Sequence, residues 1–203
     1  MSATCEHPLF ARAWTSVLGR NAMGWSDRAD LVDGLRGRVL EVGAGDGLNF
    51  EHYGDGVTEV VAVEPEPLLR ARAAERAIQR ITVLDGVAEA LPLEDGSVDA
   101  VVACLVLCTV GSQATALAEI GRVLRPGGEL RFYEHVAATG TLGRATQRAL
   151  DGSGLWPRLA GGCHLTRDTE AAIRAAGFTL PADDLRHFRV SLVPHVAGRA
   201  LKA

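Results

Sequence analysis

The chain has 203 residues, of which 21 are basic, 25 are acidic and 47% are hydrophobic, and its formal net charge is −4. This composition is typical of a soluble globular domain and argues against nucleic acid or an anionic membrane as the main partner. The start of the chain does not resemble a secretory signal, and the longest apolar run, residues 100–110, is shorter than the roughly 20 residues of a membrane helix. We therefore expect one cytoplasmic domain, residues 1–203, without a membrane anchor, and its oligomeric state stays open.

The four cysteines, Cys5, Cys104, Cys108 and Cys163, form no CxxC pair and have no spacing typical of a metal site. In a reducing compartment they are expected to be free thiols. A buried free cysteine behaves as a small hydrophobic residue, and this is the role expected for the last three. The sequence thus predicts no metal ion.

Segments with the pattern of a strand and segments with the periodicity of a helix follow one another along the chain. Strands are predicted at residues 38–42, 59–63, 81–84, 98–103 and 129–136. Helices are predicted between them at residues 48–53, 67–79 and 113–124, and Arg-Pro-Gly-Gly ends the last of these. Strands that alternate with helices in this way indicate an α/β fold with a parallel sheet.

Two further helices are predicted before the first strand, at residues 9–18 and 21–35. Because they precede the alternating part of the chain, they lie outside its repeating core. We expect residues 1–37 to form a helical cap and residues 38–203 to form the cofactor-binding core.

The end of the chain supplies the remaining elements. Residues 140–159 are weakly helical, and a helix at residues 166–176 is followed by two last strands at residues 187–192 and 195–200. A closing strand pair adds an antiparallel edge to a parallel sheet. The prediction is a Rossmann-like, doubly wound sheet of seven mostly parallel strands with an antiparallel edge strand.

A glycine-rich turn follows the first strand, in the segment Leu40–Phe50 with the sequence LEVGAGDGLNF. Gly43, Gly45 and Gly47 occupy every second position, as is needed where the backbone takes a positive φ or a ligand approaches it closely. A helix expected from about Leu48 would direct its free N–H groups at a ligand above the turn. Strand, turn and helix start together predict a nucleotide-type site at the carboxyl edge of the sheet.

The spacing of the glycines distinguishes between two kinds of nucleotide. A dinucleotide fingerprint reads G-x-G-x-x-G, but here the third glycine comes one residue earlier and Leu48 stands in its place. Glu41 precedes the turn, and Glu64 follows Gly43 by 21 residues, about the spacing at which a carboxylate binds a ribose diol. This pattern resembles the S-adenosylmethionine site of class I methyltransferases.

Further motifs resemble the ubiquinone-biosynthesis-like branch of that fold, known as methyltransferase type 11. LEDGSVDAVVA leads into the fourth strand, and VLRPGGEL leads into the fifth. DGVAE follows the third strand, where methyltransferases contact the adenine amine, here through Asp85 or Glu89. The resemblance implies S-adenosylmethionine as the cofactor, and the residues expected around it are Glu41, Gly43, Ala44, Gly45, Gly47, Asn49, Glu64, Pro65, Gly86, Val87, Ala88, Glu89, Cys104 and Leu105.

A narrower resemblance runs from about residue 38 to the end of the chain. CLVLCTV (104–110), RVLRPGGELRFYEHV (122–136) and GCHLTRDT (162–169) are similar to the animal methyltransferase-like-seven proteins and their bacterial relatives. The resemblance implies S-methylation of a small alkyl thiol. The animal proteins begin with a hydrophobic membrane anchor, whereas residues 1–37 here are mixed and polar. This difference favours a soluble enzyme and leaves the substrate open.

A thiol reacts as its thiolate, so such an enzyme needs a base or a positive charge near the acceptor sulfur. His135 and Glu134 end the fifth strand, and we expect only one of them to face the site because neighbouring strand residues point to opposite faces. We favour His135 as base or substrate contact, with an orienting hydrogen bond as its alternative and a buried salt bridge as the alternative for Glu134. Arg167 could stabilise a thiolate or be a surface charge, and His164 is the fourth catalytic candidate.

Two other functions stay open. A methyltransferase that acts on carbon or oxygen of a quinol or polyketide-like ring would have the same fold. A cofactor-binding subunit without turnover is the second alternative, although the glycine turn, Glu64 and the polar strand ends argue against it. The sequence favours a small-molecule acceptor, and only the family resemblance identifies it as a thiol.

Overall fold

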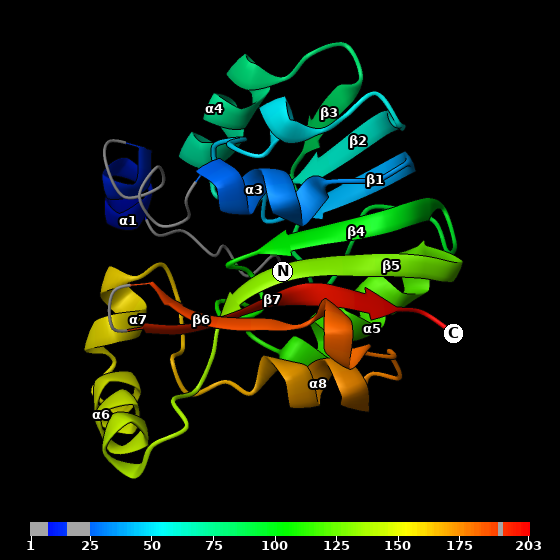
Figure 1. Cartoon of the computed structure of the whole chain (residues 1–203). Helices are drawn as coiled ribbons and strands as arrows, with labels where there is room; N and C mark the ends of the chain where they lie inside the picture. The colour runs from blue at the N-terminus through cyan, green and yellow to red at the C-terminus, as the bar shows by residue number, and fades with distance from the viewer. Residues whose placement is uncertain (1–7, 16–24, 191–192) are drawn as a thin grey trace.

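The computed structural model describes residues 8–15, 25–190 and 193–203, which form a seven-stranded sheet covered by helices (Figure 1). The strands lie in the order β3-β2-β1-β4-β5-β7-β6. Their bounds are β1 Gly37–Val42, β2 Val57–Val63, β3 Ile81–Leu84, β4 Val98–Cys104, β5 Leu124–His135, β6 Arg186–Val190 and β7 Val193–Leu201. The predicted Rossmann-like fold class is confirmed.

The order of the strands defines a point at which the direction of winding reverses. From β1 the chain moves through β2 to β3 on one side, and β4 then starts on the other side of β1 and leads to β5. Ligands of such sheets bind at the carboxyl ends of the two strands that flank this switch point, here β1 and β4. β7 is antiparallel to both β5 and β6, so the antiparallel strand lies one place in from the edge.

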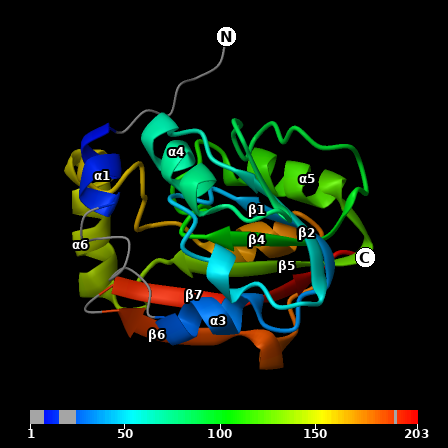
Figure 2. The ribbon, with the colours of Figure 1, turned by 90° about the horizontal axis from the view of Figure 1, so that it is seen from above.

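Helices cover both faces of the sheet. α3 lies on one face and α5 lies on the other (Figure 2). α8 packs beside α5. α6 and α7 lie beyond the end of the sheet toward which β4 and β5 point (Figure 1). The bounds are α1 Pro8–Ala13, α3 Trp25–Val32, α4 Pro67–Arg76, α5 Gln113–Val123, α6 Thr141–Gly152, α7 Leu155–Leu159 and α8 Thr169–Ala175, with 3-10 turns η2 Phe50–His52 and η3 Ala182–Asp184.

The apolar residues of the central strands are buried from both sides, as in other parallel sheets with two helical layers. Leu40 of β1 belongs to the core beneath α5, which buries Leu117 and Ile120. Its neighbour Val39 points to the other face and packs with Val32 of α3. The central strands are therefore fixed in register, since a shift by one residue would exchange their two faces.

The helix predicted at residues 48–53 is wrong. The glycine turn leads instead into η2, a 3-10 turn of three residues. Gly47 has a φ of +78°, and a Cβ there would lie 2.7 Å from the ring of Phe50, so the chain turns back tightly at this point. Asn49 makes no capping hydrogen bond, because its side chain is bonded elsewhere. The glycine turn is therefore not followed by a helix whose N-terminus faces this site.

Other predicted elements differ at their ends. β5 begins at Leu124, five residues before the predicted strand, because Leu124 pairs with Val98 before residues 125–128 bulge out and Glu129 resumes the pairing with Ala100. α8 begins after Asp168, whose side chain accepts a hydrogen bond from Ala171 N and caps the helix. The weakly helical residues of the predicted stretch 140–159 form α6 and α7.

Parts of four predictions lie outside the described residues. The helices predicted at 9–18 and 21–35 are represented by α1 and α3, and residues 16–24 between them are not described. The end of the strand predicted at 187–192 and Cys5 also lie outside the described part. Within the described part, no helix is long and apolar enough to cross a membrane.

We predict that Gly43→Ala destabilises the protein much more than Gly127→Ala. Both glycines have a left-handed φ, which costs an alanine about 1–2 kcal/mol. A Cβ at Gly43 would also lie 2.5 Å from Cγ2 of Val106, whereas nothing lies within 4 Å of one at Gly127. Overpacking adds about 1–3 kcal/mol at Gly43. Urea unfolding measures both losses, and equal losses would contradict the close approach at Gly43.

Candidate active site

The glycine turn and the end of β4 meet at the switch point of the sheet. Gly43 and Gly45 take φ values of +61° and +59°, and Val106 packs against Gly43. Leu105, which follows β4, also has a left-handed φ of +59°, a conformation that costs energy in a non-glycine residue. Cys104 ends β4, and burial raises the pKa of its thiol to about 12. The expected cofactor residues after β1 and after β4 are thus brought together.

Glu64 lies directly after β2, beside this turn. Its carboxylate accepts hydrogen bonds from Gly45 N at 2.8 Å and Glu66 N at 2.9 Å, and its residue is 5% exposed. Burial raises the pKa of Glu64, and the two N–H donors lower it in part. A carboxylate has about four acceptor positions, so about two remain for a ligand. Pro65 follows and accepts a hydrogen bond from Arg70 through its carbonyl.

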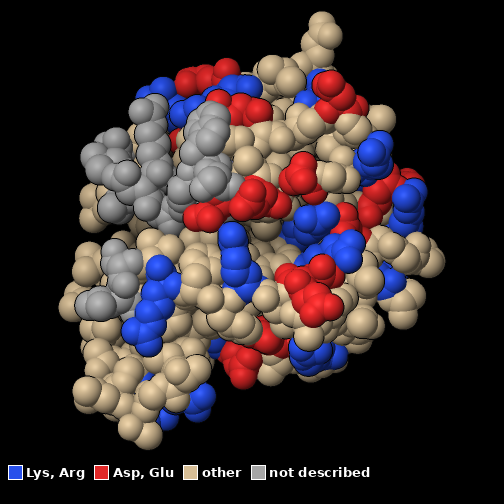
Figure 3. Space-filling model, viewed as in Figure 1, with Lys and Arg blue, Asp and Glu red and all other residues tan. Residues whose placement is uncertain are grey.

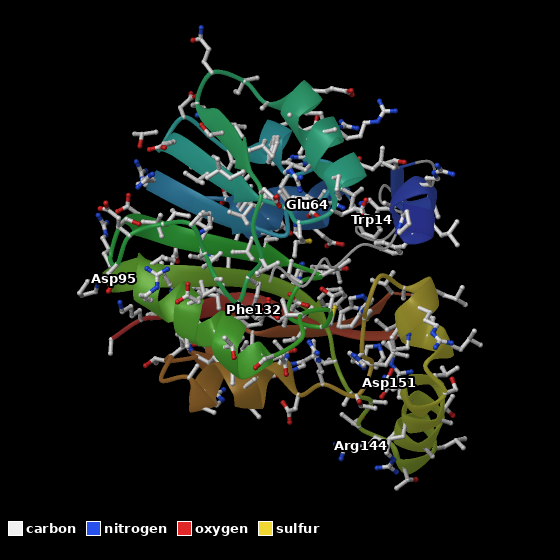
Figure 4. All side chains as sticks on the ribbon, turned by 180° about the vertical axis from the view of Figure 1, so that it is seen from behind. Trp14, Glu64, Asp95, Phe132, Arg144 and Asp151 are labelled. Carbon is white, nitrogen blue, oxygen red and sulfur yellow. The ribbon has the colours of Figure 1, made fainter. Side chains whose placement is uncertain are left out.

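Trp14 covers the glycine turn from the N-terminal part of the chain. Its indole N–H donates to Asp46 Oδ1 at 3.2 Å, and the same nitrogen lies 3.6 Å from a Cβ built on Gly45. Arg76 of α4 pairs with the other oxygen of Asp46 at 3.6 Å. Figure 4 shows Trp14 and Glu64 on the same side of the molecule, at the end of the parallel strands. Trp14 and Glu64 thus border the turn together.

A buried polar network supports the turn from below. Glu41 accepts hydrogen bonds from Asn49 Nδ2 at 2.9 Å and from the hydroxyl of Tyr53 at 2.7 Å. Arg28 of α3 donates to Asn49 Oδ1 at 2.8 Å. All four residues are buried, and the sequence analysis named neither Arg28 nor Tyr53 as a candidate. Glu41 and Asn49 were expected at the cofactor, and the structure ties their side chains to this network instead, so they position the turn.

Residues 85–89 follow β3 at the same edge of the sheet. Asp85 is exposed and pairs with Arg70 at 3.1 Å. Glu89 Oε1 accepts hydrogen bonds from the backbone of Gly111 and Ser112, and thereby holds the start of α5. Ala88 is buried in the core, and Gly86 lies against Val63, where a Cβ would be 3.0 Å from Cγ1. Val87 forms an isolated bridge to Ala90.

Glu134 is wholly buried and holds the segment that follows β4. Its Oε1 accepts hydrogen bonds from the backbone N–H groups of Val106 and Leu107, and its Oε2 accepts one from Cys108, at distances of 2.8 to 3.0 Å. Burial raises the pKa of Glu134 to about 7, although the three N–H groups act in the other direction. The buried salt bridge considered as its alternative is therefore replaced by three backbone hydrogen bonds.

Arg167 holds the same segment from its other side. Its guanidinium donates to the carbonyl oxygens of Leu107 and Val110. His164 contributes through its backbone N–H, which donates to the carbonyl of Cys108 at 2.8 Å. The segment after β4, residues 105–110, is thus fixed by β5 and by the chain that precedes α8.

His135 lies between two cysteines. Its Nδ1 is 2.9 Å from Cys163 Sγ and 3.9 Å from Cys108 Sγ. Hydrogen bonds to Cys108 and to His135 lower the pKa of the Cys163 thiol. The hydrogen bond to Cys163 and burial raise the pKa of the Cys108 thiol. Which of the two side chains faces the acceptor stays a prediction, but both Glu134 and His135 approach Cys108, Glu134 at its backbone N–H and His135 at its sulfur. The reason is that the segment after β4 passes directly beside the end of β5.

The charged surface is mixed in sign. On the face shown in Figure 3, acidic and basic side chains of the described residues lie side by side. Arg186 of β6 pairs with Asp27 of α3 at 3.3 Å, and Arg199 of β7 pairs with Asp184 at 2.8 Å. These arginines are thus paired within the molecule.

The chain is similar to known proteins over most of its length. Residues 40–132 match the family model described as a methyltransferase domain. Human thiol S-methyltransferase TMT1A is 39% identical over 176 residues, which cover 81% of this chain and 70% of that protein. Mouse thiol S-methyltransferase TMT1B is 37% identical over 205 residues, with 96% and 83% covered.

A solved structure from Thermotoga maritima is also similar. It is described as an S-adenosylmethionine-dependent methyltransferase, possible histamine N-methyltransferase, and it matches with a TM-score of 0.71 at 22% identity. The match covers 96% of this chain and 97% of that one. Fold, family model and relatives together define a class I methyltransferase that uses S-adenosylmethionine. The chain belongs to the methyltransferase family that contains TMT1A and TMT1B, and the family expected from the sequence is confirmed.

We predict that Glu41 makes stability depend on pH. Burial raises its pKa from 4.5 to about 7 in the folded state, so the folded protein keeps a proton that the unfolded chain loses at lower pH. This stabilisation is complete below about pH 4.5 and is lost as the pH rises toward 7. Relative to Glu41→Gln, the wild type should lose about 3 kcal/mol between about pH 4.5 and about pH 8, at about 1.4 kcal/mol per pKa unit. Urea unfolding across this range gives the difference, and a difference independent of pH would contradict the buried position of this carboxyl.

Proposed function

We propose that the protein methylates a small thiol on sulfur. The observation that carries this proposal is that human TMT1A and mouse TMT1B, both named thiol S-methyltransferases, are 37–39% identical to this chain over most of its length. The EHV triplet at the end of β5 and the GCHLTR segment belong to two of the stretches that resemble that type, and they contact each other through His135 and Cys163. The acceptor is a small molecule, and we propose that the reaction takes place in the cytoplasm within a single domain.

The glycine turn and the ends of β2 and β3 hold the cofactor in this proposal. The free acceptor positions of Glu64 bind the ribose hydroxyls, and the backbone of Gly43, Ala44 and Gly45 approaches the cofactor closely. Gly86 and Val87 lie beside the adenine. S-adenosylmethionine supplies a methyl group on a positively charged sulfur. Methyl transfer is an in-line displacement, so the main task of the protein is to align the acceptor with that methyl group.

The segment 105–110 and His135 form the acceptor side. Val106 packs on Gly43 and Cys108 lies beside His135. Glu134 and Arg167 keep this segment in place through its backbone. Glu134 and Arg167 are therefore positioning residues. His135 contacts the acceptor or assists the loss of its proton, since its ring is only partly buried.

We predict that Glu64→Ala weakens the binding of S-adenosylhomocysteine by about 1–3 kcal/mol, the scale for loss of a charge-assisted hydrogen-bond partner. The matched control is Glu59→Ala, which removes a half-exposed carboxylate from β2, the strand that Glu64 follows, at a position paired with Arg38. Isothermal titration calorimetry should give unchanged affinity for the control. Unchanged affinity for Glu64→Ala would remove this residue from the cofactor site.

The acceptor is tested with a panel of alkyl thiols and phenols and with cofactor that carries a labelled methyl group. We expect the label on sulfur of the thiols, and we expect His135→Ala to lower kcat/KM for thiols by about a hundredfold with unchanged cofactor affinity. The control His187→Ala changes an exposed histidine on β6 and should retain activity. Label found only on oxygen or carbon would make the enzyme a methyltransferase of that other kind, and bound cofactor without any transfer would favour a non-catalytic subunit.

A further inference from the structure

Three side chains with metal-binding atoms converge beyond the ends of β4 and β5. Cys108 follows β4, His135 ends β5, and Cys163 precedes α8. Cys108 Sγ, His135 Nδ1 and Cys163 Sγ all lie within 4.8 Å of one another. Both cysteines are buried, while His135 is partly exposed. The cluster therefore has two ligands that are shielded from solvent, Cys108 and Cys163, and one that is partly exposed, His135.

The spacing of these atoms is close to that of a zinc site. Zinc binds sulfur at about 2.3 Å and imidazole nitrogen at about 2.0 Å in a tetrahedral arrangement, which puts ligand sulfur and nitrogen about 3.5 Å apart. The two observed sulfur–nitrogen distances are 2.9 and 3.9 Å, one on each side of that value. Small rotations of the side chains are enough to bring all three onto one ion. Thiolate and imidazole ligands select zinc over magnesium or calcium, which prefer oxygen.

The backbone around the ligands is fixed by other contacts. Cys108 N donates to Glu134 and the carbonyl of Cys108 accepts from His164 N, so this residue is held on both sides. Cys163 N donates to the carbonyl of Ala160 at 3.1 Å. A site whose ligands are already placed loses little conformational entropy when an ion binds. These contacts also explain why Cys108 and Cys163 stay together although they are 55 positions apart in the chain.

We propose that Cys108, His135 and Cys163 bind a zinc ion whose fourth position takes the sulfur of the substrate thiol. Three protein ligands with an open fourth position are characteristic of catalytic zinc, whereas structural sites use four. The second half of the proposal, binding of the substrate sulfur, rests on the proposed thiol methylation. It also replaces proton transfer to His135 by direct coordination as the way in which the thiol is activated.

The chemistry of the step is balanced without any further reagent. A thiol that coordinates zinc gives up its proton to solvent and is held as the thiolate at neutral pH. The thiolate then attacks the methyl carbon, forming a sulfur–carbon bond while the bond from that carbon to the sulfonium breaks and its electron pair stays on the leaving sulfur. The product is an uncharged thioether, a poor ligand for zinc, and it dissociates.

The position of the cluster suits this step. Cys108 comes two residues after Val106, and Val106 packs on Gly43 of the cofactor turn. β4 and β1 are neighbouring parallel strands, so both segments leave the sheet at the same edge. A sulfur bound at the cluster is therefore on the acceptor side of the site.

The metal site is tested on protein purified with a phosphine reductant, stripped with a chelator and titrated with Co²⁺. We expect one Co²⁺ per chain with a thiolate-to-cobalt charge-transfer band, displaced by one equivalent of Zn²⁺. Cys108→Ser and Cys163→Ser should lose the band, while Cys104→Ser, which removes the third described thiol, should keep it. Thermal unfolding shows whether the serine variants are folded. An absent band in the wild type, a band that survives in both folded serine variants, or a Cys108–Cys163 disulfide under these conditions would overturn the proposal.

The fourth position is tested by adding 2-mercaptoethanol to the cobalt protein. Coordination of its sulfur should strengthen the charge-transfer band, and the corresponding methyl thioether should leave the band unchanged. Metal binding without any response to the thiol would overturn substrate coordination. Transfer of methyl groups to thiols by protein that contains no metal would overturn the zinc site and leave the proposed function intact. A cobalt site in a protein that methylates only phenols would leave the metal site intact and overturn the proposed thiol methylation.

Discussion

The buried carboxylate of Glu134 fixes the segment that forms the proposed acceptor side of this enzyme. It accepts three hydrogen bonds from successive backbone N–H groups of residues 106–108 and so joins β5 to the segment that follows β4. A wholly buried carboxylate is costly unless it is fully bonded, and these N–H groups would themselves be costly to bury without a partner. The carboxylate and the three N–H groups are therefore stable in the interior only while they are bonded to one another. Removal of Glu134 would release the segment that carries Val106 and Cys108.

The segment of residues 106–108 also packs against the glycine turn, which forms the proposed cofactor side of the site. Val106 packs where a side chain at Gly43 would have to lie, so the glycine turn after β1 and the turn after β4 fit each other closely. Beneath the turn, Glu41 and Asn49 connect it to Arg28 of α3. The two halves of the site are therefore built by neighbouring strands at the switch point, where this fold type binds its ligands.

The sequence predicted most of the fold because its signals are local. Apolar strand runs, the glycine spacing and helix caps such as Asp168 are read from a few adjacent residues, and the seven strands and the cofactor follow from them. The helix expected at residues 48–53 was wrong because packing of Phe50 on Gly47 outweighs the local preference. Likewise, β5 begins at Leu124 because the strand pairing resumes around a bulge that no local pattern reveals.

The candidate site was predictable only in part. Glu64 could be placed beside the glycine turn from their distance in the sequence, because the turn and Glu64 directly follow two consecutive strands, β1 and β2. The cluster of Cys108, His135 and Cys163 could not, because its members lie in three separate segments without a metal-type spacing and meet only when β4 and β5 pair. The partnership of Arg28 with Asn49 likewise depends on how α3 packs on the sheet.

A crystal structure of the protein with S-adenosylhomocysteine tests the central claim most directly. We predict that the ribose hydroxyls contact the carboxylate of Glu64 and that the sulfur of the cofactor faces residues 105–110 and His135. A ribose bound away from Glu64, or a sulfur turned away from that segment, would contradict the site described above.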